Sequence, residues 1–232
     1  MFVDPRRVIP ILVQSGAATA EALYQEAERD ARLALSLAMG QGVTGHEDQF
    51  WRDYFVTVIR RAGVPEAQVD LASQTLRRQH HEDHLWTWIQ EGAAEALVRI
   101  REMGYRLGIV SNADGRVEAL LQRLGLAELV EFVIDSHAVG VSKPDPRIFR
   151  MGADRLGLRP EECLYVGDLY AIDVLGSRAA GLQPLLLDPF DRLGHWEDVD
   201  RISSVADLPD WLAARRGGGG PKDRDDGGTE PE

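Results

Sequence analysis

Polar side chains that could bind an anion or a metal follow two short apolar runs in the C-terminal half of the chain. Ser111 and Asn112 end the first run, Asp168 ends the second, and a further acid stands at Asp173. A hydroxyl and an amide at the start of a helix, beside free backbone N–H groups, form an anion site. Carboxylate oxygens are the hard donors that Mg²⁺ prefers, together with a substrate phosphate. These residue types favour chemistry on an anionic substrate.

Each of these residues also has a structural explanation. Ser111 and Asn112 could simply cap the following helix, because their side chains accept hydrogen bonds from its first N–H groups. Asp173 could cap the next helix and interact favourably with its dipole. Asp168 follows Gly167, which permits close approach of the backbone and favours a functional role.

A single lysine stands out on the segment between these two apolar runs. Lys143 precedes Pro144, which disfavours helix at the lysine, and Pro146 suits the start of a helix. Among 26 Lys and Arg residues, only Lys143 and Lys222 are lysines. This residue usage favours a function at position 143 that needs a compact ammonium and not a planar guanidinium. The alternative is that Lys143, like most single lysines, is a solvated surface charge.

Short apolar strands that alternate with amphipathic helices must position these residues. We expect strands at 106–111, 132–135, 164–167 and 184–187. We expect helices at 93–103, 116–124, 146–156 and 174–180. This alternation predicts parallel strands with right-handed crossovers, hence an α/β, doubly wound core. Ligands of such sheets bind beyond the carboxyl ends of the strands.

The N-terminal part of the chain is predicted to be helical throughout. Residues 1–88 carry apolar side chains at three-to-four spacing, namely Leu23, Ala27, Ala31, Ala34 and Leu37. Thr44 with Glu47 fits a capping box, Gly63 fits a helix stop, and Pro65 fits a helix start. We expect an α/β core over 89–214 and a disordered, acidic, Gly-rich tail over 215–232.

Composition limits the classes of function. The net charge of −12 argues against nucleic-acid binding, which depends on Lys and Arg at phosphates. The one cysteine, Cys163, lies in an apolar run and suits a buried thiol in a reducing compartment. No apolar run approaches the length of a membrane span. We therefore expect a cytoplasmic protein without membrane or nucleic-acid partners; its oligomeric state cannot be read.

Ser111-Asn112, Lys143-Pro144 and Gly167-Asp168 with Asp173 occur in a fixed order relative to the expected strands. Together they resemble motifs II, III and IV of the haloacid-dehalogenase-like (HAD) superfamily, over roughly residues 92–189. The resemblance implies a HAD-like doubly wound, Rossmann-like sheet with an α-helical cap, formed here by residues 1–88.

The resemblance also implies an activity and roles for residues. It implies a magnesium-dependent phosphatase acting on a small phosphorylated metabolite. Ser111 would hydrogen-bond the transferring phosphoryl group, with Asn112 next to the substrate. Lys143 would neutralise nucleophile and phosphate, Asp168 would ligate Mg²⁺, and Asp173 would support the metal or its waters.

The first motif of the family, a strand ending in Asp-x-Asp-x-Thr, has no match in this sequence. Asp4 is followed at the required positions by Arg6 and Val8, so it fits poorly. Asp188 ends an apolar run, but its place suits a structural last strand. We expect the central nucleophile strand to be absent, which leaves two unpaired inner edges and an inactive chain. A late start codon or a truncated chain explains this absence, with a true pseudoenzyme as the alternative.

Other functions stay open to different degrees. A catalytically dead phosphate-binding or regulatory protein would keep the fold and lack the nucleophile. A haloacid dehalogenase needs no metal, so Asp168 and Asp173 count against it. A phosphonatase needs a lysine in the cap, and no lysine precedes Lys143. His80 and His84 could share a helix face as metal ligands, but we favour a solvated hinge packed by Trp86 and Trp88.

Overall fold

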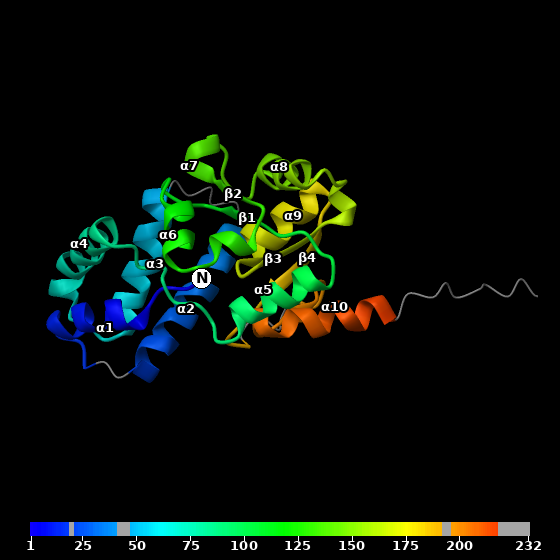
Figure 1. Ribbon diagram of the computed structural model, residues 1–232. Coiled ribbons are helices and arrows are strands. Elements are labelled where there is room, and N and C mark those ends of the chain that lie inside the picture. Colours follow the sequence, from blue (N-terminus) through cyan, green and yellow to red (C-terminus); the bar gives the residue numbers. More distant parts are fainter. Residues whose placement is uncertain (19–20, 41–46, 192–195, 218–232) are drawn as a thin grey trace, which may run out of the picture.

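The computed structural model describes residues 1–18, 21–40, 47–191 and 196–217. The first four helices gather on one side of the molecule, and the strands with the later helices form the other side (Figure 1). The first four are α1 (Pro5–Gln14), α2 (Glu21–Gly40), α3 (Glu47–Arg61) and α4 (Glu66–Glu82). Thr44 of the predicted capping box lies outside the described residues, as does the tail from 218 onwards.

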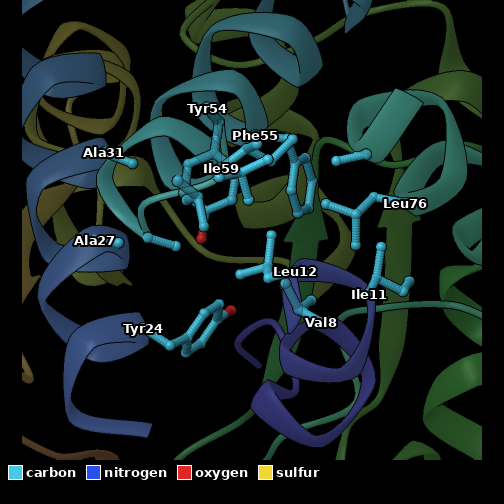
Figure 2. Packing of buried hydrophobic residues seen from close by; sticks show 14 of the residues in the cluster. Val8, Ile11, Leu12, Tyr24, Ala27, Ala31, Tyr54, Phe55, Ile59 and Leu76 are labelled. Carbon is cyan, nitrogen blue, oxygen red and sulfur yellow. The ribbon is translucent and has the colours of Figure 1, made fainter. Parts of the chain in front are cut away.

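The four helices enclose one hydrophobic cluster. Phe55 is completely buried there and packs edge-on against Tyr54 and Trp86, with ring centroids 4.9 Å and 5.8 Å away. Figure 2 shows side chains of α1, α2, α3 and α4 converging on this cluster. Asp4 is the N-cap residue of helix α1, and its side chain accepts a hydrogen bond from the N–H of Arg6.

The buried face of α2 differs from the predicted one. Leu23 and Leu37 are 47% and 49% exposed, and Ala34 is also exposed. Ala27 and Ala31 are buried as predicted, but their neighbours on the buried face are Tyr24 and Leu35. The helix is thus rotated by about one residue, because the two alanines fit either of two overlapping faces and the large Tyr24 ring decides between them.

The α/β part contains short strands and helices in alternation. Its strands are β1 (Gly108–Ser111), β2 (Phe132–Asp135), β3 (Leu164–Gly167), β4 (Gln183–Leu187) and β5 (Arg201–Ile202). Its α-helices are α5 (Ala93–Glu102), α6 (Val117–Arg123), α7 (Ser136–Val139), α8 (Pro146–Leu156), α9 (Leu175–Ala180) and α10 (Leu208–Gly217). A π-helical turn, η3 (Tyr170–Val174), precedes α9. Three-residue 3₁₀ turns are η1 (Ala127–Leu129), η2 (Pro160–Glu162) and η4 (Val205–Asp207).

Every strand pair is parallel, as the alternation predicted. Strand β1 pairs with β2, and β3 pairs with β4, which pairs with β5. In the described parts of the chain no ladder joins β1 to β3. The strand expected from residue 106 begins only at Gly108, where the aromatic ring of Phe132 would clash with any added Cβ. The other three expected strands agree to within one residue.

The first residues of the chain contribute to the core of the α/β part. Phe2 is 2% exposed and shares a cluster with Leu107, Leu164 and Val166. Its backbone pairs antiparallel with Trp88, and the two rings lie 5.6 Å apart. The N-terminus accordingly lies near the middle of the molecule, where the helical and α/β parts meet (Figure 1). Phe2 thus packs with apolar side chains of β3.

Two further expectations meet the structure here. Helix α10 continues to Gly217, so residues 215–217, predicted to begin the disordered tail, are helical. Cys163 is a buried free thiol, as predicted. None of the described helices combines the length and the apolar character that crossing a membrane requires.

The packing of Phe55 generates a stability prediction. Replacing Phe55 by Ala should lower the free energy of unfolding by about 3–5 kcal/mol, because it removes a fully buried ring and leaves a cavity. Urea denaturation followed by circular dichroism measures the change. The control is Leu71→Ala on the exposed face of α4, where Leu71 is 59% exposed and a change within about 0.5 kcal/mol is expected. Equal unfolding curves for the two variants would contradict the described cluster.

Candidate active site

Lys143 lies at the centre of the candidate site. Its ammonium donates to Asp173 Oδ1 at 2.7 Å and to the Tyr165 hydroxyl at 3.0 Å. The Tyr165 hydroxyl in turn donates to the carbonyl of Val110 at 3.1 Å. Tyr165 belongs to β3 and Val110 to β1, so this chain of hydrogen bonds connects the two sheets near the C-terminal ends of their strands.

The environment fixes the charge of Lys143. Burial alone would lower the pKa of the ammonium, but Asp173 and then Tyr165 outweigh burial and raise that pKa above its usual range. The side chains of Lys143 and Asp173 are only 13% and 3% exposed. Lys143 is therefore a charged residue in a buried pair, and the alternative of a solvated surface lysine is excluded.

Asn112 holds the backbone of the lysine. Its side-chain oxygen accepts from the Lys143 N–H at 2.7 Å, and its NH₂ donates to the Lys143 carbonyl at 2.9 Å. Both polar atoms of the amide are thus engaged on one residue. The structure places Asn112 as a clamp that positions Lys143, which is a different contact from the substrate contact implied by the resemblance.

Ser111 is the last residue of β1, opposite Asp135 in the parallel register. Asp135 accepts from the N–H groups of Gly115 and His137 at 2.9 Å, and the Ser136 hydroxyl accepts from the N–H of Ala113 at 3.0 Å. The end of β2 therefore shapes the loop after Ser111. Within the described part of the chain the Ser111 hydroxyl has no hydrogen-bond partner, which leaves it able to bind an anion.

The two acids of the site have different surroundings. Asp173 lies in the π-helical turn and is buried, and its second oxygen accepts from the Leu169 N–H at 3.0 Å. Asp168 is 31% exposed through its side chain and forms an ion pair with Arg32. Glycine is required at position 167, because a Cβ there would lie 2.3 Å from the carboxylate carbon of Asp173.

Arg32 reaches this site from helix α2 and was not identified by the sequence analysis. Its guanidinium donates to Glu28 at 3.0 Å and to Asp168. The Tyr54 hydroxyl donates to the same Glu28 oxygen at 3.0 Å. The arginine side chain is 13% exposed, and Asp168 and Glu28 raise its pKa against the opposing effect of burial. The one sequence signal was a Glu28–Arg32 pair at helical spacing on an otherwise apolar face.

The α-amino group of Met1 lies among these charges. Burial lowers the pKa of this group, whereas Asp168 raises it and the cations Arg32 and Lys143 lower it further. The site thus gathers positive groups in a protein whose net charge is −12.

The donor set can be tested for its fit to Mg²⁺. Asp168 has a partly exposed carboxylate, which suits a cation that keeps several waters. Both oxygens of Asp173 already accept hydrogen bonds, from Lys143 and from Leu169. The residues present fit a metal held directly by Asp168, whereas the contacts of Asp173 fix the position of Lys143.

Among the described residues, His80, His84 and Asp114 form a group of three potential metal ligands. Their geometry does not favour a metal. The Nδ1 atoms of both histidines already accept backbone N–H groups, from Leu85 and Trp86 at 3.3 Å, which leaves only their Nε2 atoms for a metal. A metal would need the lone pairs of Nε2.

Arg116 adds a second reason against a metal. It lies 3.2 Å from His80 Nε2 and donates to Asp114 at 2.5 Å, so a cation already occupies the group. The expected solvated hinge is corrected in part: Trp86 packs on His80 as expected, but His80 is only 8% exposed and Trp88 packs on Phe2 instead. The edge-on packing of Trp86 against His80 explains why His80 is not solvated.

Asp4 and Asp188 have structural surroundings. Asp4 is buried and accepts from the backbone and side chain of Arg6, whose hydrogen bond lowers the pKa of Asp4. Asp188 is buried at the end of β4 and forms an ion pair with Arg201 at 3.2 Å. Asp4 therefore serves as the start of α1, and Asp188 serves as an anchor beside β5.

The buried histidine generates a prediction on pH. Burial, followed by His84, lowers the pKa of His80 from 6.5 to about 4, so the folded state disfavours its protonation. This contribution to stability is complete above pH 6.5 and is lost as the pH falls towards 4. Over the same interval Asp114, whose pKa is about 2, stays ionised, because hydrogen bonds from Arg116 outweigh burial.

In His80→Asn, which keeps an acceptor for Leu85, the fall of Tm between pH 6.5 and 4 should be shallower than in the native protein. His81→Asn, on the exposed neighbour, should leave the slope unchanged. Differential scanning calorimetry across this interval provides the comparison. Parallel Tm curves for the native protein and His80→Asn would show that His80 does not carry the acid sensitivity.

Known proteins resemble this chain over most of its length. The family model for haloacid dehalogenase-like hydrolases matches residues 6–181. Haloacid dehalogenase-like hydrolase domain-containing protein 3 of Mus musculus is 40% identical over 159 residues, which cover 66% of this chain and 61% of the mouse protein. Glyceraldehyde 3-phosphate phosphatase of Methanopyrus kandleri is 31% identical over 160 residues, 68% of this chain and 66% of the relative. The chain thus spans less than two thirds of the length of these relatives.

A solved structure agrees in fold. The magnesium-bound HAD hydrolase YfnB of Bacillus subtilis has a TM-score of 0.66 at 20% identity, covering 90% of this chain and 93% of that one. The parallel sheets and this likeness in fold confirm the HAD-like α/β architecture that the sequence predicted. With the family match extending over three quarters of its residues, the chain belongs to the haloacid dehalogenase-like hydrolase family.

Proposed function

We propose that this protein serves as a magnesium-dependent phosphatase that hydrolyses a phosphomonoester of a small metabolite. The observation that carries the proposal is the buried, charged Lys143, held by Asp173 of the π-helical turn and by Tyr165 of β3. A fixed ammonium suits a phosphoryl group, together with a serine hydroxyl at the end of β1 and a partly exposed carboxylate directly after β3. The glyceraldehyde 3-phosphate phosphatase of Methanopyrus kandleri, 31% identical to this chain, supports the same class of substrate.

Each residue of the chain would contribute a distinct interaction. The Ser111 hydroxyl would donate to a phosphoryl oxygen, and Lys143 would offset negative charge that develops during phosphoryl transfer. Asp168 would hold Mg²⁺, with Asp173 fixing Lys143 beside it. When bound, the metal supplies further neutralisation of the phosphoryl oxygens. In the acidic field of the whole protein, these local cations would attract the anionic substrate.

The nucleophile is not matched by any residue of this sequence. In the reaction implied by the family, an aspartate oxygen bonds to phosphorus as the alcohol leaves, and water then releases inorganic phosphate and regenerates the carboxylate. We propose that an additional strand ending in Asp-x-Asp-x-Thr supplies this aspartate. A phosphate-binding protein without catalytic activity is the second candidate, which the lack of a matched nucleophile in the sequence favours.

Phosphate release from a panel of phosphorylated metabolites tests the proposal. The 232-residue chain should show no release above background, and a version extended by such a strand should release phosphate only with Mg²⁺. In the extended version, Asp168→Asn should lower the affinity for Mg²⁺ by about 10–100-fold and reduce turnover as well. Asp191→Asn, at a carboxylate that is 94% exposed, is the matched control.

Two results would overturn these assignments. Magnesium-dependent release by the 232-residue chain that persists after Asp4→Asn would remove the need for another aspartate. An unchanged magnesium dependence in Asp168→Asn would remove Asp168 from the metal site. If the extended version binds phosphate but never hydrolyses an ester, the phosphate-binding candidate is preferred.

A separate prediction concerns Lys143. In the extended version, Lys143→Arg should lose turnover by about 100-fold, nearly as much as Lys143→Met, because the longer planar guanidinium misplaces the charge. The two variants should differ in stability. Lys143→Met leaves Asp173 buried without a charge partner, which costs about 3–5 kcal/mol, whereas Lys143→Arg keeps a partner.

Turnover and Tm measured on both variants separate these effects. The control is Arg147→Met, which removes an exposed arginine four residues after Lys143, in the first turn of α8. Native turnover in Lys143→Arg would show that the precise placement of the ammonium is unimportant, and Lys143 would leave the site.

A further inference from the structure

Arg32, a residue of the helical cap, directly contacts an acid of the proposed site. It lies on α2 and forms an ion pair with Asp168, 136 residues away along the chain. Its other partner, Glu28, is one helical turn earlier and is itself fixed by the Tyr54 hydroxyl. The guanidinium also lies over the ring of Phe2, 4.8 Å from its centroid. These contacts hold a charged fork at the interface between cap and core.

Burying the guanidinium of Arg32 costs free energy, and a function of its positive charge would account for that cost. An arginine side chain that is 13% exposed has lost most of its hydration, and Glu28 alone would satisfy its charge within the cap. The second contact instead directs the guanidinium towards the core. A planar fork suits phosphate oxygens, which it can bind through two parallel hydrogen bonds.

We propose that Arg32 is a substrate-binding residue of the cap, which exchanges Asp168 for the phosphoryl oxygens of the substrate when Mg²⁺ takes Asp168. This inference rests on the proposed function and adds to it the cap residue that recognises the phosphoryl group. Glu28 and Tyr54 keep the guanidinium in place during the exchange. The charges support this exchange. Mg²⁺ and Arg32 compete for the carboxylate of Asp168, whereas a phosphoryl oxygen beside Asp168 is attracted by Mg²⁺ and by Arg32 alike.

The exchange predicts opposite effects of one substitution on two ligands. Removing Arg32 frees Asp168 from its competitor, so Mg²⁺ alone should bind more tightly. Removing Arg32 also deletes a charged donor to the anion, so inorganic phosphate should bind more weakly when Mg²⁺ is saturating. A residue with a merely structural role would weaken both ligands together or neither.

Isothermal titration calorimetry on the 232-residue chain measures both affinities without any need for turnover. In Arg32→Met, we expect Mg²⁺ to bind about tenfold more tightly and phosphate about tenfold more weakly, as for the loss of one charge-assisted hydrogen bond. Arg29→Met is the matched control, because Arg29 lies on the same helix and contacts the carbonyl of Gln25 and the ring of Phe190. Arg29→Met should match the native protein for both ligands.

Arg32→Lys keeps the experiment decisive if Arg32→Met fails to fold with Glu28 buried. A lysine retains a positive partner for Glu28 but cannot hold two carboxylates with one fork, so the same two changes should appear with smaller size. Circular dichroism and Tm verify that each variant is folded.

The outcomes separate the inference from the function on which it rests. Native 232-residue protein that binds neither Mg²⁺ nor phosphate would overturn the role of Arg32, whereas the proposed function is decided separately by phosphate release from the extended version. Native protein that binds both, with unchanged affinities in Arg32→Met and Arg32→Lys, would overturn only the role of Arg32. Weakening of both ligands by the same factor would assign Arg32 a structural role and equally reject the exchange.

Discussion

The ion pair between Lys143 and Asp173 is the interaction on which the arrangement of the site depends. It joins the loop after β2 to the π-helical turn after β3, and the Tyr165 hydroxyl extends it to the carbonyl of Val110 on β1. Two sheets without a common ladder in the described residues are therefore connected by side chains. A buried charge pair requires such a complete set of partners, because each unsatisfied oxygen or proton would be costly in the interior.

The same pair explains several local choices of residue. Gly167 has no side chain because the Asp173 carboxylate occupies the space of a Cβ. Asn112 uses its whole amide to fix the backbone of Lys143, and the π-helical turn brings the Leu169 N–H onto the second oxygen of Asp173. Neighbouring residues are thus constrained by the geometry of one ammonium.

The sequence predicted the strand ends well because parallel strands place their terminal residues at one edge of a sheet. Ser111 and Asp168 were singled out by this rule and Lys143 by the rarity of lysine in the chain, and the strands at 132–135 and 164–167 agree with β2 and β3. Periodicity was less informative for α2, since small alanines fit two overlapping faces. Arg32 and Tyr165 were missed because their partners are far apart in the chain, and no local pattern encodes a contact across 136 residues.

Arg116 links the segment after Ser111 to the end of the cap. It donates to the carbonyls of His80 and His81 at 3.1 Å and 3.0 Å, and to Asp114 in its own loop. Any rotation of α4 away from the core must either break these hydrogen bonds or carry the loop with it. Ser111, at the end of β1, directly precedes that loop. A displacement of α4 would therefore also reposition the hydroxyl that we propose as a phosphate ligand.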